Sequence, residues 1–141
     1  MSFTLTARHE RFFRHARHMA EMSDFKRARV GCVAVVGNKI VATGFSQQRT
    51  HPMQDYYNRF RDFRGQKNVC AKLHAECAML ASSQHTSINW AKADVYIYRI
   101  CKSRPFGNSK PCQSCEKAMK FFGIKNIYHS TDEWFEHLRL A

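Results

Sequence analysis

The residues of this chain whose types and spacing could perform chemistry fall into two short motifs. The first is His74-Ala75-Glu76, and the second is Pro111-Cys112-Gln113-Ser114-Cys115. Zinc prefers imidazole nitrogen and thiolate sulfur, and a catalytic zinc keeps three protein ligands and leaves its fourth position to water. His74, Cys112 and Cys115 would fill those three positions. The two motifs therefore predict a catalytic Zn²⁺ site.

Glu76 is the carboxylate that this ligand set leaves over. Zinc lowers the pKa of a bound water from ~15.7 towards ~7, so that hydroxide is present at neutral pH. Glu76 follows the histidine closely enough to take a proton from that water and pass it on. H-x-E followed by P-C-x-x-C is the signature of zinc-dependent base deaminases, in which the glutamate is a general acid and base. We expect Glu76 to be the proton shuttle of a hydrolytic deaminase, not a metal ligand.

Other interpretations of the cysteines are weaker. A C-x-x-C pair alone also serves structural zinc sites and thiol redox chemistry. A structural zinc site normally closes with four ligands, and the sequence near this pair contains no second C-x-x-C. A second zinc site would draw on four residues whose spacing fits no compact motif, namely His51, Cys70, His85 and Cys101. The sequence thus favours the catalytic site.

Length and composition fit one domain. The chain has 141 residues, 44% of them hydrophobic and 13% aromatic, which is enough for one core. We expect a single zinc-dependent deaminase domain over residues 1–141. No apolar run approaches the ~20 residues that cross a bilayer, and the first residues lack the apolar stretch of a signal peptide. The expectation is a soluble, cytoplasmic protein with reduced cysteines and no membrane partner.

The charge of the chain indicates an anionic partner. Lysine and arginine number 23 and aspartate and glutamate 11, which gives a net charge of +12. A positive surface of this strength attracts phosphate groups, either in a free nucleotide or along a single-stranded nucleic acid. The alternative is that the charge serves solubility only.

Hydrophobic periodicity and turn residues predict alternating helices and strands. We expect helices over residues 7–23, 74–83 and 111–122, strands over 30–36, 39–45, 94–100 and 125–128, and a last helix that begins at residues 130–133. Both metal motifs then stand at helix starts, where unpaired N–H groups and the helix dipole favour thiolates. The order of elements predicts an α/β fold in which the ligands meet at one edge of a central sheet.

The segment between Ser46 and Leu73 is long and rich in aromatic and basic residues. Pro52 and Gly65 favour a helix between them, with a stripe formed by Tyr56, Tyr57, Phe60, Phe63 and Arg64. One interpretation makes this stripe core packing. In the other, exposed rings alternate with Arg59, Arg61 and Arg64 to stack on bases and bind phosphates of a single strand.

With its motifs in this order, the chain resembles the cytidine deaminase-like superfamily, and most of all its deoxycytidylate and tRNA adenosine deaminase branch. The resemblance is carried by residues 28–35, 40–45, 73–80, 111–115 and 123–128. It implies a three-layer α/β/α fold with a central mixed sheet. Because the chain stops at Ala141, the fifth strand of that fold could be missing or very short.

The resemblance also implies substrate contacts. Ala28 and Ser46 would line the base pocket, and the backbone of Ala75 would face the base. Two departures affect this pocket: Ser46 stands where the branch commonly has asparagine, and a longer loop precedes Pro111. In that loop, Arg104 could clamp a phosphate and Phe106 could stack on a base, unless the loop is simply solvated.

These features lead to three functional hypotheses. The first is a deoxycytidylate-type enzyme that converts cytosine to uracil in a free nucleotide and releases ammonia. The second is a deaminase that acts on cytosine or adenine in single-stranded DNA or RNA. The third is a non-catalytic, zinc-bearing nucleic-acid-binding protein. By analogy with small deaminases, a homo-oligomer is also expected.

Overall fold

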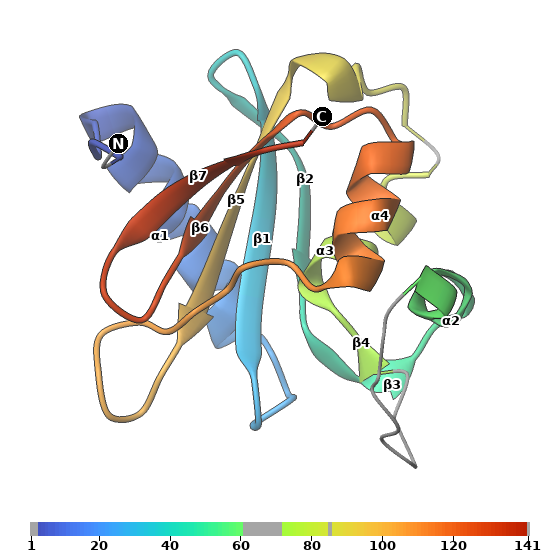
Figure 1. Ribbon diagram of the computed structural model, residues 1–141, viewed down its shortest axis with the longest axis horizontal. Helices are drawn as coiled ribbons and strands as arrows, with labels where there is room; N and C mark the ends of the chain where they lie inside the picture. Colours follow the sequence, from blue (N-terminus) through green and yellow to red (C-terminus); the bar gives the residue numbers. More distant parts are fainter. Residues whose placement is uncertain (1–2, 61–71, 85, 141) are drawn as a thin grey trace.

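The computed structural model of the chain describes residues 3–60, 72–84 and 86–140. The elements in these ranges are α1 (Ala7–Glu21), β1 (Arg29–Val36), β2 (Lys39–Phe45), β3 (Gln47–Thr50), α2 (Pro52–Tyr57), a 3-10 turn (Asn58–Phe60), β4 (Lys72–Leu73), α3 (Ala75–Ser82), a second 3-10 turn (Trp90–Lys92), β5 (Ala93–Ile100), α4 (Gln113–Phe121), β6 (Asn126–Ser130) and β7 (Phe135–Arg139). Figure 1 shows their arrangement.

The central sheet has five strands in the order β2-β1-β5-β6-β7. β5 and β6 run parallel, whereas the other neighbours are antiparallel. β3 and β4 pair separately as a small antiparallel sheet. The mixed sheet expected from the sequence is thus confirmed.

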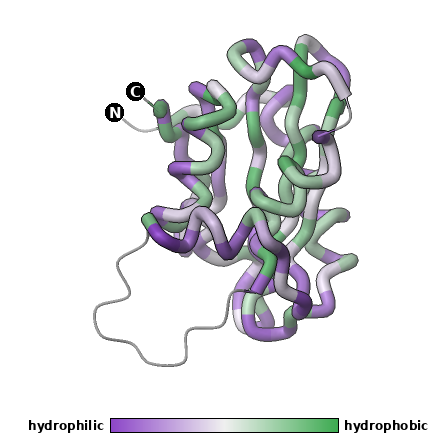
Figure 2. Tube along the Cα trace, turned by 90° about the vertical axis from the view of Figure 1, so that its right-hand side faces the viewer, coloured by the Kyte–Doolittle hydropathy of each residue, from purple (hydrophilic) through white to green (hydrophobic). Residues whose placement is uncertain are grey.

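Helices cover both faces of this sheet (Figure 1). α1 packs on β1 and β5, and its Phe12 belongs to a core cluster with Val33 and Tyr96. On the opposite face, Cys32 and Ile97 belong to the cluster that contains the buried residues of α3 and α4. Side chains alternate along a strand, so β1 and β5 supply both clusters. Hydrophobic residues accordingly gather along the central strands in Figure 2. The three-layer α/β/α fold is confirmed, and α3 and α4 share one face.

The first helix has the predicted amphipathic character, although it ends at Glu21 and not at Ser23. The Thr6 hydroxyl accepts a hydrogen bond from the His9 N–H, and the His9 ring accepts one from the Thr6 N–H. The buried side of α1 holds Phe12, Phe13, Ala16 and Ala20, and its solvent side is mostly basic. Within the described ranges, no helix combines the length and the apolar character needed to cross a membrane.

The C-terminal region differs from the prediction of a last helix. The Thr131 hydroxyl does not start a helix but accepts hydrogen bonds from the N–H groups of Glu133 and Trp134, which closes a tight turn. β7 follows and pairs antiparallel with β6, and Phe135 is buried against the core cluster of α1. An unpaired strand edge favours this pairing over local helix formation. β7 is therefore the fifth strand that the sequence left in doubt.

The aromatic segment forms less helix than predicted. α2 begins at Pro52 but ends at Tyr57, and the predicted continuation with Arg61, Phe63, Arg64 and Gly65 lies outside the described residues. Tyr57 is buried, whereas Tyr56 is 52% and Phe60 45% exposed. The core-packing interpretation is confirmed for Tyr57 and is wrong for Tyr56 and Phe60.

Gly44 in β2 lets the sheet approach α3 closely. A Cβ atom at this position would collide with the Ala75 carbonyl oxygen and the Met79 backbone nitrogen. Backbone atoms cannot rotate away as a side chain can. Because α3 follows His74 and carries Glu76, this close approach sets the position of both residues over the sheet.

We expect Gly44→Ala to lower the free energy of unfolding by about 1–3 kcal/mol, as overpacking does, because α3 must move away from β2. Urea unfolding measures the change. Gly37→Asn is the matched control: Gly37 has a φ of 66° and nothing near its missing Cβ, and asparagine tolerates that backbone conformation. An unfolding midpoint for Gly44→Ala equal to that of the control would contradict the close approach.

Candidate metal centre and active site

The three predicted metal ligands converge because two helices begin at the same place. His74 is the N-cap residue of α3, and Cys112 is the N-cap residue of α4, with Cys115 in the first turn of α4. Neither N-cap side chain makes a capping hydrogen bond. The His74 Nδ1 atom lies 3.4 Å from the Cys112 Sγ atom and 3.3 Å from the Cys115 Sγ atom. Both sulfurs thus face one imidazole nitrogen.

This geometry fits zinc. Bonds of ~2.0 Å to nitrogen and ~2.3 Å to sulfur at tetrahedral angles place ligand atoms about 3.5 Å apart, close to the separations of His74 from the two thiols. The three ligand atoms lie within 4.8 Å of one another, and they form the one such group found among the described residues. Cys70 and His85, which a second site would need, lie outside the described residues. One nitrogen and two sulfurs leave a coordination position open, as catalytic zinc requires.

The thiols are prepared for metal binding. A hydrogen bond with the Cys115 thiol lowers the pKa of Cys112 to about 3, and the neighbouring His74 lowers it further against the effect of burial. The same hydrogen bond raises the pKa of Cys115. The pair thus favours loss of the proton from Cys112, and the start of α4 contributes the positive end of its dipole to a thiolate there. Cys77 is buried, with its Sγ 4.0 Å from that of Cys115.

Glu76 lies in the first turn of α3 and is only 5% exposed. Burial raises the pKa of this carboxyl to about 7, although the nearby His74 acts in the opposite direction. A group with a pKa near neutrality can both accept and donate a proton under working conditions. The side chain lines the same pocket as His74 and Cys112. Its position therefore suits proton transfer.

The pocket has a volume of about 140 Å³. The structure brings six of the predicted site residues to its wall: Ala28, Ser46, His74, Ala75, Glu76 and Cys112. The wall also includes Lys110, a loop cation that the sequence offered for phosphate binding, and residues that sequence reasoning missed, among them Phe25, Arg99, Asn108 and Ser109. This volume is below the ~300 Å³ at which drug-sized ligand sites begin. It suits a single ring, with the rest of a ligand at the mouth.

Ser46 forms the pocket wall through its hydrogen bonds. Its hydroxyl donates to the Ala28 carbonyl at 2.7 Å and accepts from the Val30 N–H at 3.0 Å. The hydroxyl of Ser23 lies 2.7 Å away. Ser46 is 4% exposed, so the hydroxyl that replaces the amide of the family fixes the chain around Ala28.

Arg104 and Phe106 do not reach the pocket. Arg104 forms an ion pair with Asp132 at 3.0 Å, and Phe106 packs against Phe135 with ring centroids 4.7 Å apart. Phe106 and Tyr98 belong to the core cluster of α1, on the opposite face of the sheet from the metal ligands. The loop folds back over β7, a strand that the sequence did not predict. The expected contacts of Arg104 and Phe106 with substrate are therefore corrected.

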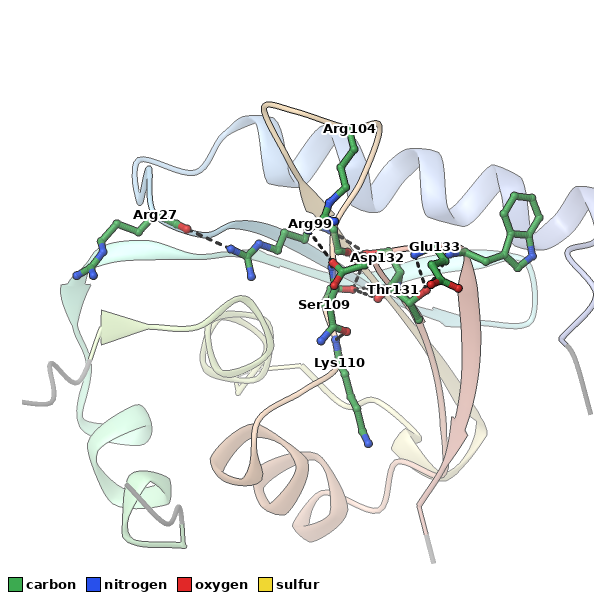
Figure 3. A network of polar contacts seen from close by, with 12 residues as sticks. Arg27, Arg99, Arg104, Ser109, Lys110, Thr131, Asp132 and Glu133 are labelled. Carbon is green, nitrogen blue, oxygen red and sulfur yellow. Dashed lines mark hydrogen bonds and ion pairs between the residues drawn. The ribbon is translucent and has the colours of Figure 1, made fainter. Parts of the chain in front are cut away.

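A buried network fixes the chain that leads into Cys112 (Figure 3). The Ser109 hydroxyl donates to the Ile97 carbonyl at 3.0 Å, and the Ser130 hydroxyl donates to the Gly107 carbonyl at 2.6 Å. The Asn108 N–H donates to the Asp132 carboxylate at 3.0 Å. These bonds join the loop to the ends of β5 and β6. These hydrogen bonds therefore fix the position at which the Pro111–Cys115 motif begins.

Gln54 of α2 is a positioning residue that sequence reasoning missed. It is fully buried, and its Oε1 atom accepts a hydrogen bond from the His74 N–H at 3.0 Å. Its Nε2 atom donates to Asn58 at 2.9 Å. A signal was available, because Gln54 stands one helical turn before the buried Tyr57 and so had to face inwards. Gln54 orients the residue that ligates the metal.

We expect Gln54→Leu to weaken zinc binding about 10- to 100-fold, as loss of an outer hydrogen bond to a ligand does. The leucine leaves the His74 N–H without its acceptor while filling a similar volume. Competition with a chromogenic chelator measures the zinc affinity. Gln48→Leu, at an exposed position, is the control, and equal affinities in the two variants would exclude the positioning role.

The purified protein should contain one zinc per chain, and Cys112→Ser should lose most of it because a serine hydroxyl is a poor zinc ligand. Elemental analysis gives the stoichiometry. Cys101→Ser changes a half-buried cysteine outside the ligand group and should keep the metal. Retention of zinc by Cys112→Ser, or its loss from both variants, would argue against the ligand set.

Comparisons with known proteins agree with this geometry. The sequence matches the family described as the cytidine and deoxycytidylate deaminase zinc-binding region over residues 6–131. No curated protein matches it. Among solved structures, the dCMP deaminase of the cyanophage S-TIM5 is 21% identical with a TM-score of 0.60, and the match covers 87% of this chain and 82% of that one. The cytidine deaminase of Burkholderia pseudomallei is 14% identical with a TM-score of 0.64, over 93% and 91% of the two chains.

At these identities the structural likeness shows the fold, whereas the sequence match shows the family. The matched residues include both motifs and most of the central sheet. Their donor set, one imidazole and two thiols, is what the zinc of that family requires. The chain belongs to the zinc-binding cytidine and deoxycytidylate deaminase family.

Proposed function

We propose that the protein deaminates cytosine in a nucleotide of the deoxycytidylate type, giving uracil and ammonia. The observation that carries this proposal is the buried carboxyl of Glu76, which shares a pocket with a His/Cys/Cys metal site. Family membership supports the reaction type. Support for the substrate comes from the cyanophage dCMP deaminase, which has been solved in complex with dCMP and dUMP and has a TM-score of 0.61 with this chain.

The residues of the pocket divide the work of the reaction. Zinc, when held by His74, Cys112 and Cys115, supplies Lewis-acid activation of a water molecule. Glu76 would take a proton as the water oxygen attacks C4 of the base, and would deliver a proton first to N3 and then to the amino group, which leaves as ammonia. Cytosine and water thus give uracil and ammonia in balance. The walls around Ala28 and Ala75 would hold the ring and exclude other water.

The small pocket favours cytosine over adenine. It has a volume of about 140 Å³, and its lining includes Phe25, Val30 and the start of α3. A pyrimidine occupies less space than a purine. This supports the cytosine substrate over the larger adenine ring.

A polynucleotide substrate is a second candidate, and one surface favours it. Tyr56, Phe60 and Phe121 are 52%, 45% and 80% exposed. The Arg59 guanidinium lies 4.0 Å from the centre of the Tyr56 ring, and the Lys117 amino group lies 5.3 Å from that of Phe60. Exposed rings that alternate with cations can stack on bases and bind phosphates of a single strand. In this candidate, the same pocket would accept a base from a strand.

We expect zinc-loaded wild type to deaminate dCMP, and Glu76→Gln to reduce kcat at least 100-fold while zinc stays bound, because the amide cannot transfer protons. Mass spectrometry follows deoxycytidine, dCMP, adenosine and single-stranded DNA and RNA oligonucleotides in parallel. Glu133→Gln removes an exposed carboxylate outside the pocket and should be as active as wild type.

The substrate panel separates the candidates. Turnover of dCMP but not of oligonucleotides supports the free-nucleotide enzyme, whereas turnover of oligonucleotides alone supports the second candidate. Several phosphate contacts would also make the oligonucleotide reaction fall steeply with salt. Full activity of Glu76→Gln would refute the proposed role of the carboxyl, and absence of turnover with a full complement of zinc would refute the function.

A further inference from the structure

We propose that Arg99 binds a phosphate group of the substrate at the mouth of the pocket and so makes the enzyme prefer nucleotides over nucleosides. The inference rests on the proposed function and adds to it the residue that recognises the phosphate. It also replaces Arg104, which the sequence nominated for this role.

The position of Arg99 on the sheet directs it to the site. It stands two positions after Ile97 on β5, and Ile97 belongs to the core cluster on the α3 and α4 face. Side chains at alternate positions of a strand share a face, so Arg99 is on the same face as the metal ligands. It pairs with Val30 of β1, and both residues line the pocket together with Glu76. Figure 3 shows its side chain extending towards Arg27.

The charge of Arg99 is not neutralised by a carboxylate within the described part of the chain. Its guanidinium donates one hydrogen bond, to the Arg27 carbonyl at 3.3 Å. By contrast, Arg8 pairs with Asp94, and Arg104 pairs with Asp132. The remaining donors of Arg99 are therefore available to a ligand, and the neutral carbonyl of Arg27 orients the guanidinium without cancelling its charge.

The rest of the pocket wall is consistent with an anionic ligand group. Glu76 is the carboxylate among the residues that line the pocket, and it is only 5% exposed. Lys110 is a second cation in the wall, and its amino group has no ion pair among the described residues. The pocket wall thus includes two cationic side chains, Arg99 and Lys110, that can attract an anionic group.

The size of the pocket places the phosphate at this mouth. A space of about 140 Å³ suits the base, so the sugar and phosphate must extend outwards past the half-buried Arg99. The planar fork of a guanidinium donates two parallel hydrogen bonds to a phosphate, which makes arginine the usual choice for this task. The phosphate could be the monoester of a free nucleotide or a diester in a strand, since both offer the same oxygens.

The test compares one substrate with and without its phosphate. We expect Arg99→Gln to lower kcat/KM about 10- to 100-fold for dCMP and to leave deoxycytidine nearly unchanged, because charge-assisted hydrogen bonds to the phosphate are lost. Arg104→Gln is the matched control, since it removes a cation of the same region that is paired with Asp132. This variant should leave kcat/KM unchanged for both dCMP and deoxycytidine.

A single-stranded oligonucleotide with one cytosine identifies the source of the phosphate. Selective loss with dCMP indicates the monoester, and selective loss with the oligonucleotide indicates the diester; either supports the role of Arg99. Equal losses with deoxycytidine, or no loss with any substrate, would overturn it. So would an identical effect of Arg104→Gln.

Binding measurements keep this inference separate from the proposed reaction. If wild type deaminates nothing, the proposed function fails, and calorimetry with dUMP and deoxyuridine then decides the role of Arg99. Tighter binding of dUMP than of deoxyuridine in wild type, with the difference lost in Arg99→Gln, would support the phosphate site. Equal affinities, or no binding of either ligand, would contradict it.

Discussion

The convergence of two helix starts on one face of the sheet is the constraint on which the rest of this structure depends. His74 and Cys112 occupy the N-cap positions of α3 and α4, where capping side chains would normally bond to the helix, and instead they face each other across 3.4 Å. Unpaired N–H groups and two helix dipoles make this region favourable for thiolate charge. Glu76, in the first turn of α3, is buried by the same arrangement, and burial keeps its pKa near neutrality.

Several contacts far apart in the sequence hold the two helix starts in register. Gly44 admits α3 close to β2, Gln54 fixes the backbone of His74, and Ser109 ties the approach to α4 to the ends of β5 and β6. Each contact acts on a different side of the metal ligands. Deletion of any one would displace one ligand relative to the others, and a tetrahedral site tolerates little displacement.

The sequence predicted the metal ligands, the hairpin and the central strands because their signals are local. His74 and Glu76 are separated by one residue, and Cys112 and Cys115 by two. Such short spacings identify the metal ligands and the proton-transferring carboxyl without knowledge of the fold. The segment at Thr131 was mistaken for a helix start because its hydroxyl can cap a helix or close a turn equally well. Pairing with β6 decided between them, and that pairing is not local.

Dependence on non-local contacts also explains why the sequence did not identify the residues around the pocket. Arg104 and Arg99 are close in sequence, but β7 supports the loop of Arg104 on the opposite face, with Asp132 as its partner. Arg99 lines the pocket because its place along β5 puts it on the same face as Ile97, and that assignment required knowledge of which face α3 covers. The sequence did not indicate the role of Gln54 for a similar reason, since its hydrogen-bond partner is the backbone N–H of His74, in a different segment.

The loop between Cys101 and Phe106 is anchored at its end by Phe106 on Phe135 and then by Gly107, Asn108 and Ser109. The anchors, not the loop, transmit position to Cys112. Insertions or exchanges between the start of the loop and Phe106 therefore leave the metal geometry intact, because this part of the loop does not line the pocket. The chain thus separates a surface loop that can vary in length and sequence from the anchored segment that carries the second metal motif.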